Sequence, residues 1–275
     1  MVDLPHLRRH YARLLAAGAN ARDPRIEDAF ATVPREDFVG PGPWTIVMNG
    51  HRVATPTADP HYLYSNSLVA LDDERNNGEP LLHAMWLAKV APKPGETAVH
   101  VGAGAGYYTA ILARLVEPGG RVVAYEIEAA LAARARANLR GFPNVELIEG
   151  DAVRLRLPKA DIVYVNAGVV APPPRWLKAL RSGGRLVFPW RPAGRIGLAL
   201  LVTRLRKGFA AEPFMGSWFI PCVGAPEAAE GARLPSRTAA RRVRSLWLRR
   251  ERTPDDTAVA AFDEVWFSSA PVPTA

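Results

Sequence analysis

The chain has 275 residues, of which 48% are hydrophobic and 23% charged, the composition of a globular protein large enough to bury a full core. No apolar run approaches the roughly 18–20 residues of a membrane-spanning helix, and the N-terminus lacks the apolar segment of a signal peptide, so we expect a cytoplasmic protein without a membrane partner. The formal net charge is +8, but the arginines that crowd residues 237–252 lack the regular interleaving of aromatic residues that stacks single-stranded bases, which argues against a nucleic acid partner.

The first forty residues are predicted to be helical. Apolar residues recur near helical spacing over 7–17 and 24–33, and the cluster Gly40-Pro-Gly-Pro43 ends this region. Residues 44–80 have no long period, so we predict a loop or small ribbon over a site, followed by a helix over 81–90. Within residues 44–80, the aromatic candidates for a substrate lid are Trp44, Tyr62 and Tyr64.

The next segment carries the most informative pattern in the chain. A buried strand is predicted over 97–101, then a turn with glycine at every second position, then a helix toward Val116. A second strand over 121–126 ends in Glu126. Strand, glycine turn, helix, strand and acid form the pattern of a nucleoside-binding βαβ unit, in which the acid accepts hydrogen bonds from ribose hydroxyls.

The spacing of the glycines favours one cofactor. Dinucleotide sites prefer G-x-G-x-x-G, whereas this chain has G-x-G-x-G, with Tyr107 at the third glycine position. A third strand from Val145 ends in Gly150-Asp151, where an acid is well placed to accept the exocyclic amine of an adenine. The pattern therefore favours S-adenosylmethionine over NAD, and a glycine-rich turn that binds nothing is the structural alternative.

The α/β alternation continues after Asp151. We predict a strand over 161–165 ending at Asn166, a helix over 174–180 and a strand over 184–189. Asn166 then faces the transferred methyl group at the switch point of the sheet.

Two strands without an intervening helix, 197–205 and 214–223, are predicted to form an antiparallel hairpin at the sheet edge. The single cysteine, Cys222, excludes an internal disulfide and a cysteine metal cluster, and we expect it to be inert in that second strand. No metal site is predicted. Beyond a linker over 226–240, two further strands are predicted, over 243–248 and 258–266.

Taken in order, several segments resemble protein-L-isoaspartate O-methyltransferases. They are Val-Pro-Arg-Glu-Asp-Phe-Val over 33–39, the glycine strand and turn over 99–110, Gly150-Asp151, and Gly-Gly-Arg-Leu-Val-Phe-Pro over 183–189. The likeness covers about residues 20–225, and Val-Pro-Arg-Glu-x-Phe-Val is far more specific than the glycine turn.

The resemblance implies a class I methyltransferase fold with S-adenosylmethionine as cofactor and methyl donor. This is an α/β fold with a doubly wound, mostly parallel, Rossmann-like seven-stranded sheet, an antiparallel edge hairpin and N-terminal helices. We expect N-terminal helices and a substrate-side loop over 1–80, the cofactor-binding domain over 81–225, and an Arg-rich extension over 226–275 packed on the core.

The resemblance also implies which residues bind the cofactor. The glycines lie under its methionine part, Glu126 lies on the ribose, and Asp151 with Ala152 lies at the adenine. The full predicted set is His100, Gly102, Ala103, Gly104, Gly106, Tyr107, Glu126, Asp151, Ala152 and Asn166.

Two positions depart from the family pattern. The family has Thr-Ile-Ser-x-Pro before the helix that precedes the glycine strand, where this chain has Asn76-Asn-Gly-Glu-Pro80, so Gly78 stands at the serine position. The family also has an acid two residues before the first glycine, where this chain has His100. A histidine answers the ammonium group of the cofactor only while it is neutral, and a buried core histidine is the alternative.

These departures bear on the acceptor. A carboxylate acceptor is already a nucleophile, whereas a hydroxyl or amine acceptor needs a base, for which the candidates are His83, His61, Asp72 and Asp73. His83 also matches a family position in the cofactor pocket. The candidate catalytic residues are Asn76, Asn77 and His83, and the candidate substrate residues are Tyr62, Asn76, Asn77 and Gly78.

The sequence thus predicts an S-adenosylmethionine-dependent methyltransferase that methylates a carboxylate on a protein or peptide. The alternatives are a methyltransferase of the same fold acting on a small molecule, a modified peptide or RNA, and a non-catalytic relative acting as a binding module. NAD-dependent oxidoreduction is a more distant alternative, because Tyr107 occupies the third glycine position.

Overall fold

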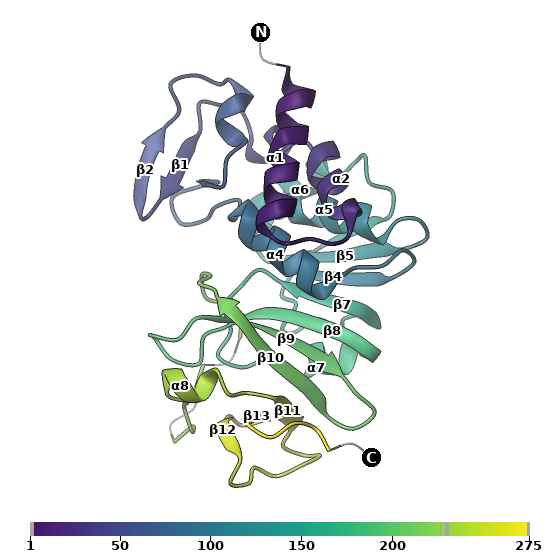
Figure 1. Cartoon of the computed structure of the whole chain (residues 1–275), viewed down its shortest axis with the longest axis vertical. Helices are drawn as coiled ribbons and strands as arrows, with labels where there is room; N and C mark the ends of the chain where they lie inside the picture. Colours follow the sequence, from purple (N-terminus) through teal and green to yellow (C-terminus); the bar gives the residue numbers. More distant parts are fainter. Residues whose placement is uncertain (1–2, 226, 229–230, 274–275) are drawn as a thin grey trace. The chain divides into compact units, whose positions relative to one another are not determined.

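The computed structural model describes residues 3–225, 227–228 and 231–273 (Figure 1). The chain divides into two compact units, and each is described by itself. Unit 1 comprises residues 1–95 and 103–149, and unit 2 comprises residues 96–102 and 150–275. Within the described ranges, no helix combines the length and apolar character that crossing a bilayer requires.

Helices dominate the N-terminal part of unit 1, as predicted. α1 (Leu4–Gly18) and α2 (Pro24–Thr32) each follow an N-cap aspartate and carry a proline within their first two residues, and each aspartate side chain accepts a backbone N–H of the first turn. α1 packs against α2 and against α4 (Pro80–Val90). The short α3 (Glu36–Val39) lies within the Val-Pro-Arg-Glu segment.

The ribbon predicted between residues 44 and 80 is confirmed. β1 (Thr45–Met48) pairs antiparallel with β2 (His51–Ala54) and with the two-residue β3 (Leu68–Val69). A 3-10 helix, η1 (Pro60–Leu63), lies between β2 and β3. Trp44, a candidate for the substrate lid, is buried beneath this ribbon in a small apolar cluster.

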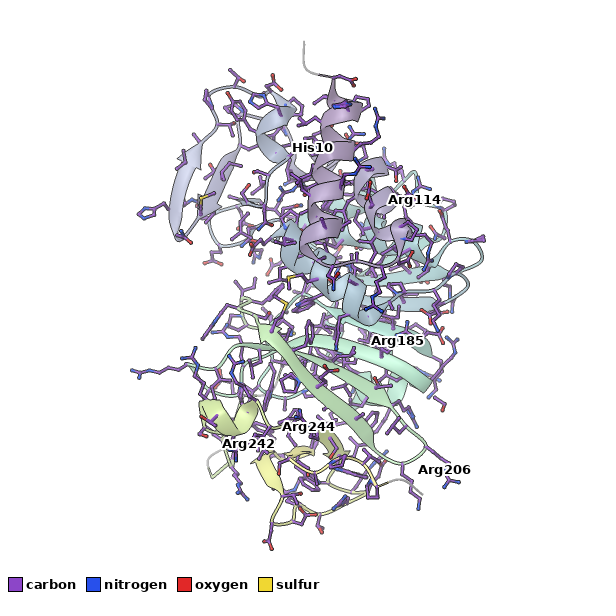
Figure 2. All side chains as sticks on the ribbon, in the orientation of Figure 1. His10, Arg114, Arg185, Arg206, Arg242 and Arg244 are labelled. Atoms are coloured by element: carbon purple, nitrogen blue, oxygen red, sulfur yellow. The ribbon has the colours of Figure 1, made fainter. Side chains whose placement is uncertain are left out.

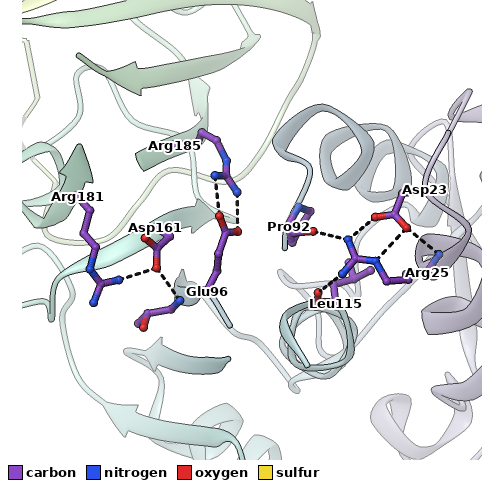
Figure 3. A network of polar contacts seen from close by, with 9 residues as sticks. Asp23, Arg25, Pro92, Glu96, Leu115, Asp161, Arg181 and Arg185 are labelled. Carbon is purple, nitrogen blue, oxygen red and sulfur yellow. Dashed lines mark hydrogen bonds and ion pairs between the residues drawn. The ribbon is translucent and has the colours of Figure 1, made fainter. Parts of the chain in front are cut away.

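The βαβ unit supplies the remainder of unit 1. β5 (Arg121–Glu126) and β6 (Val145–Glu149) run parallel, and α6 (Ala129–Asn138) packs on both. α5 (Tyr107–Val116) is buried along almost its entire length, as its apolar sequence requires. Arg25 braces this unit by donating hydrogen bonds to the carbonyls of Pro92 and Leu115, at 2.8 and 2.9 Å (Figure 3).

Unit 2 is built on a sheet with parallel strands at one end. β7 (Ala160–Val165) pairs parallel with β4 (Thr97–Val101) and with β8 (Leu180–Trp190), and α7 (Pro174–Ala179) packs on β8. Ion pairs brace the start of these strands. Arg185 binds Glu96 through two hydrogen bonds, of 2.9 and 2.7 Å, and Asp161 accepts from the Thr97 amide and from Arg181 (Figure 3).

The antiparallel hairpin is confirmed, but the predicted boundaries of its second strand were wrong, and further C-terminal strands continue the sheet beyond it. β9 (Leu198–Arg204) turns directly into β10 (Phe209–Gly216), which begins before the predicted 214 and ends before 223. Pro213 lies within β10, although proline cannot donate to a ladder. It is tolerated because the neighbouring β11 (Ser245–Leu248) pairs only with Phe209 and Ala210 of β10, so the proline lies on an open stretch of edge.

Cys222 therefore lies in an irregular segment after β10 and not in a strand, which corrects the prediction. Its backbone N–H donates to the carbonyl of Gly168, at 2.8 Å. Burial, together with the nearby Asp151 carboxylate, raises the pKa of the Cys222 thiol to about 12, so the thiol is protonated at neutral pH.

The C-terminal extension adds three strands where two were predicted. These are β11 (Ser245–Leu248), β12 (Ala258–Ala261) and β13 (Val265–Ser268), preceded by the short α8 (Arg237–Ala240). In the described part of unit 2 the strand order is β12-β13-β11-β10-β9-β8-β7-β4, so the sheet exceeds the predicted seven strands. Arg242 and Arg244 are exposed near α8 (Figure 2). The predicted α/β class, with parallel strands and an antiparallel edge, is confirmed.

Candidate active site

The glycine turn leaves open space where a ligand can lie. Gly104 has a left-handed backbone, with φ of +56°, and a Cβ placed on it would have only Leu71 Cδ1 within 4 Å, at 3.9 Å. The Gly104 N–H donates a 2.7 Å hydrogen bond to Glu126 Oε2. The turn and the acid that the sequence pattern joined as one motif are therefore in direct contact in unit 1.

Glu126 is held in place by backbone amides. It ends β5 and is 6% exposed, and its second oxygen, Oε1, accepts the N–H of Glu128 at 3.0 Å. Burial raises the pKa of this carboxyl, and the amide hydrogen bonds oppose that shift because they stabilise the charged form. Each carboxylate oxygen can accept more than one hydrogen bond, so the fixed carboxylate retains capacity for ribose hydroxyls.

Gly78, at the family's serine position, has no space for a side chain. Its φ is +75°, and a Cβ would lie 2.7 Å from His83 Nε2 and 2.8 Å from the Tyr108 ring. These two rings stack with their centroids 3.5 Å apart and their planes at 16°. Asn76 stabilises the turn by accepting the Gly78 N–H at 2.9 Å. The backbone itself lies against the stacked rings, which is why this position is glycine.

Asn77 and Tyr62 occupy different surroundings in unit 1. Asn77 is buried, and its side-chain carbonyl accepts a hydrogen bond from Arg35 at 3.3 Å. Tyr62 lies in η1, where its ring packs on His61 at 3.8 Å between centroids. The structure therefore brings Asn76, Gly78 and His83 together, whereas the Asn77 side chain points to the buried arginine.

The remaining candidate bases of unit 1 are engaged in surface turns. His61 Nδ1 lies 3.0 Å from Asp59. Asp72 accepts two backbone amides and pairs with Arg75 at 3.0 Å, and Asp73 is exposed. Among the described residues, no group of three or more side chains is arranged to hold a metal ion.

In unit 2, His100 lies inside the protein on β4. It is 0% exposed, and its ring packs edge-on against Tyr164 of the neighbouring strand, at 5.6 Å between centroids. Burial lowers the pKa of His100 to about 3, although the nearby side chain of Asn166 opposes the shift. The imidazole is therefore neutral at physiological pH. Asn166 follows β7, and its backbone lies 3.6 Å from the position of a Cβ on Gly102.

Asp151 and Ala152 follow β6 and belong to unit 2. Asp151 Oδ1 accepts the N–H of Val153 at 2.7 Å, and its Oδ2 lies 3.4 Å from Arg154 Nε. The Ala152 carbonyl accepts from Trp176 Nε1 at 3.1 Å. Gly224 lies directly against the Asp151 carboxylate, because a Cβ there would be 2.4 Å from Oδ2.

Three of these contacting residues are absent from the predicted site. They are Arg35, Tyr108 and Gly224. Arg35 stands in the Val-Pro-Arg-Glu segment, which the sequence marked as specific without indicating a role. Tyr108 follows Tyr107 on a helix that the sequence predicts only to be apolar, and no pattern in the sequence links Gly224 to Asp151.

Comparison with known proteins identifies relatives along most of the chain. A family model described as protein-L-isoaspartate (D-aspartate) O-methyltransferase matches residues 11–227. The protein-L-isoaspartate O-methyltransferase of Methanoregula boonei is 33% identical over 224 residues, which cover 79% of this chain and 93% of the relative. That of Methylorubrum populi is 32% identical over 231 residues, covering 80% and 96%.

Solved structures share the fold. A protein-L-isoaspartate O-methyltransferase structure superposes with a TM-score of 0.69 at 20% identity, covering 94% of this chain and 86% of its own. A putative protein-L-isoaspartate O-methyltransferase from Plasmodium falciparum, solved in complex with S-adenosyl-L-homocysteine, gives a TM-score of 0.64 at 17% identity and covers 78% and 97%. By its sequence relatives and its fold, this chain belongs to the protein-L-isoaspartate (D-aspartate) O-methyltransferase family.

Proposed function

We propose that this protein is an S-adenosylmethionine-dependent O-methyltransferase whose acceptor is the side-chain carboxylate of an isoaspartyl residue in a protein or peptide. Membership of the family supports the reaction class. The observation that carries the cofactor assignment is the Gly104 N–H bound to the fixed Glu126 carboxylate, beside open space at the turn.

The cofactor fits the chain's own groups. When bound, S-adenosylmethionine supplies an electrophilic methyl group on a sulfonium. We assign Glu126 to the ribose, the glycine turn to the methionine part, and Asp151 with Ala152 to the adenine. Neutral His100 would not repel the cofactor's ammonium group and could accept a hydrogen bond from it, directly or through water.

The acceptor side requires orientation and no base. An aspartyl-type carboxylate is ionised at neutral pH and attacks as it stands. Alignment and exclusion of water supply much of the rate in such an in-line displacement, up to about 7–11 kcal/mol. Without a serine hydroxyl at Gly78, we assign the orientation of the carboxylate to Asn76 and to backbone N–H groups, with His83 beneath the turn.

Incubation with methyl-labelled cofactor tests the proposal. We expect base-labile methyl ester on a peptide that contains isoaspartate and none on the same peptide with normal aspartate. The Glu126→Gln variant should bind S-adenosylhomocysteine more weakly in calorimetry, because it loses the charge that ribose hydroxyls bind. Methylation that is stable to base, or equal labelling of both peptides, would end the isoaspartyl assignment.

A second acceptor is favoured by one observation. Gly78 removes a hydroxyl that the family pattern contains, so another carboxylate on a protein or a modified peptide is the alternative substrate. A cytoplasmic location, the absence of a nucleic acid partner and the domain boundaries at residues 80 and 225 stay predictions.

A further inference from the structure

Arg35 is a cation buried completely inside unit 1. It is 0% exposed, and its guanidinium uses every N–H it has. The acceptors are the carbonyls of Leu63 (2.7 Å), Ser65 (3.3 Å), Ser67 (2.7 Å) and Gly78 (3.3 Å), and Asn77 Oδ1 (3.3 Å).

All five acceptors are neutral oxygens. In the part of the chain that the structure describes, Arg35 has no carboxylate within ion-pair distance. Burying a cation without a counterion is costly, and an apolar side chain of similar size would avoid that cost. The benefit of a buried arginine here must therefore be geometric, because its planar guanidinium group fixes several backbone segments relative to one another.

Arg35 joins the turn assigned to the acceptor to a neighbouring segment. Asn77 with Gly78 forms the turn at the family's serine position, and residues 63–67 begin at the end of η1, next to the substrate candidate Tyr62, and include the lid candidate Tyr64. Other hydrogen bonds also hold these irregular residues: the hydroxyls of Ser65 and Ser67 bond each other, Asn66 bonds Glu79 and the Leu81 N–H, and Asn76 accepts the Gly78 N–H. Backbone hydrogen bonds run from the N–H of Asn77 to Val69, of Ala70 to Thr45 and of Ser67 to Ser65. Arg35 bonds directly to both segments.

The same guanidinium influences the start of α5. Burial raises the pKa of Tyr107 and Tyr108 well above that of free tyrosine, and the positive charge of Arg35 opposes both shifts. These tyrosines directly follow the glycine turn. The charge of Arg35 therefore acts both at the acceptor turn and at the first turn of α5, beside the proposed methionine site.

We infer that Arg35 is a positioning residue, which holds the Leu63–Ser67 segment and the Asn77–Gly78 turn in the geometry that aligns the acceptor carboxylate for methyl transfer. The inference rests on the proposed function. Its structural half, that one side chain orders both segments, does not depend on which substrate is methylated.

The test compares Arg35→Lys and Arg35→Met with a control, Arg25→Met. Lysine keeps the charge but loses the fork. Arg25 also donates to two backbone carbonyls in unit 1, those of Pro92 and Leu115, but touches neither acceptor segment. Amide hydrogen exchange, S-adenosylhomocysteine calorimetry and steady-state kinetics with the isoaspartyl peptide are measured on each folded protein.

We expect both Arg35 variants to exchange the amides of Ser67, Ala70 and Asn77 at least about tenfold faster. We also expect the kcat/KM for the peptide to fall about 10–100-fold, while the affinity for S-adenosylhomocysteine changes less than about threefold. Arg25→Met should leave those amides and the peptide kinetics unchanged even if it lowers Tm.

The inference would be overturned if Arg35→Lys had the amide exchange rates and the peptide kcat/KM of the wild-type protein. It would also be overturned if the variants lost peptide kcat/KM and S-adenosylhomocysteine affinity by the same factor. If Arg35→Met does not fold, Arg35→Lys alone decides. If the wild-type protein does not methylate the isoaspartyl peptide, the proposed function fails, and hydrogen exchange still tests whether Arg35 orders the two segments.

Discussion

At the scale of single residues, Gly78 shows that a missing side chain can be a requirement of the local structure. We predict that Gly78→Ser, which supplies the family's serine, lowers the free energy of unfolding by about 1–3 kcal/mol and does not raise methylation. The added Cβ meets His83 and Tyr108 at a backbone with positive φ. Urea unfolding and peptide methylation measure the two effects.

Gly50→Ser is the matched control for that substitution. Gly50 has a similar φ, +81°, but no atom lies within 4 Å of an added Cβ. It therefore reports the cost of the backbone conformation alone, and Gly78→Ser should be the more destabilising of the two. A Gly78→Ser protein that is as stable as Gly50→Ser and more active than wild type would show that the turn adapts to a hydroxyl.

His100 gives a prediction about pH. Its pKa is about 3 in the folded protein and about 6.5 when unfolded, so below pH 6.5 the unfolded chain binds more protons. The free energy of unfolding should therefore fall as the pH falls from 6.5, by about 1.4 kcal/mol per pH unit from this group alone. His100→Gln should lack that part of the slope.

Denaturant unfolding of both proteins between pH 8 and pH 5 measures the difference, because every other titrating group is common to the two. Parallel stability profiles would mean that His100 is not held neutral by burial. The sequence marked His100 as a departure from an acid, with a buried core histidine as the alternative, but the proximity of Asn166 depends on the pairing of β4 with β7 and is not encoded locally.

Some contacts of the site could be predicted from the sequence, and others could not. The contact between Gly104 and Glu126 followed from the sequence because strand, turn and acid occur in a fixed order along one βαβ unit. The partners of Arg35 did not follow, because four of its five acceptors are main-chain carbonyls, which every residue carries. Only the folded loop decides which carbonyls converge.

At the scale of elements, ion pairs brace the start of the parallel strands in unit 2. Glu96 and Arg185 form a bidentate salt bridge, with side chains that are 15% and 17% exposed. We predict that Glu96→Gln lowers the free energy of unfolding by about 1–3 kcal/mol, because it removes a charge-assisted pair that is shielded from water.

Glu117→Gln is the control for an exposed pair. Glu117 lies 3.2 Å from Arg114, and both side chains are more than a third exposed, so we expect a change below about 1 kcal/mol. Denaturant midpoints at low and high salt compare the two variants. Equal effects at both sites would mean that the Glu96 pair is screened like a surface pair.

Element boundaries failed where the tertiary environment overrides local signals. Periodicity located the helices and the parallel strands within a few residues, because each buries one apolar stripe or is buried on both faces. The predicted start of β10 was five residues late, since the pairing of Phe209 and Ala210 with both β9 and β11 depends on the folded sheet and is not visible in the local sequence. The predicted strand over 258–266 proved to be two strands, β12 and β13, which pair with each other.

At the scale of the whole molecule, the family match ends at residue 227 but unit 2 does not. Phe267 of β13 stacks on Trp190 of β8 with centroids 4.4 Å apart, and both side chains are 0% exposed. β11 also covers the start of β10, whose edge would otherwise be open. The extension is therefore part of the core of unit 2.

We predict that Phe267→Ala lowers the free energy of unfolding by about 3–5 kcal/mol, because it removes a large buried ring and leaves a cavity beside Trp190. Leu234→Ala, at a residue of the extension that is 47% exposed, should change it by less than about 0.5 kcal/mol. Urea unfolding followed by tryptophan fluorescence measures both. If Phe267→Ala unfolds like wild type, the extension is an appendage, and a chain ending at residue 227 should then keep the oligomeric state of the full-length chain. If the ring supports the core as its burial indicates, that shortened chain should aggregate through the exposed edge of β10.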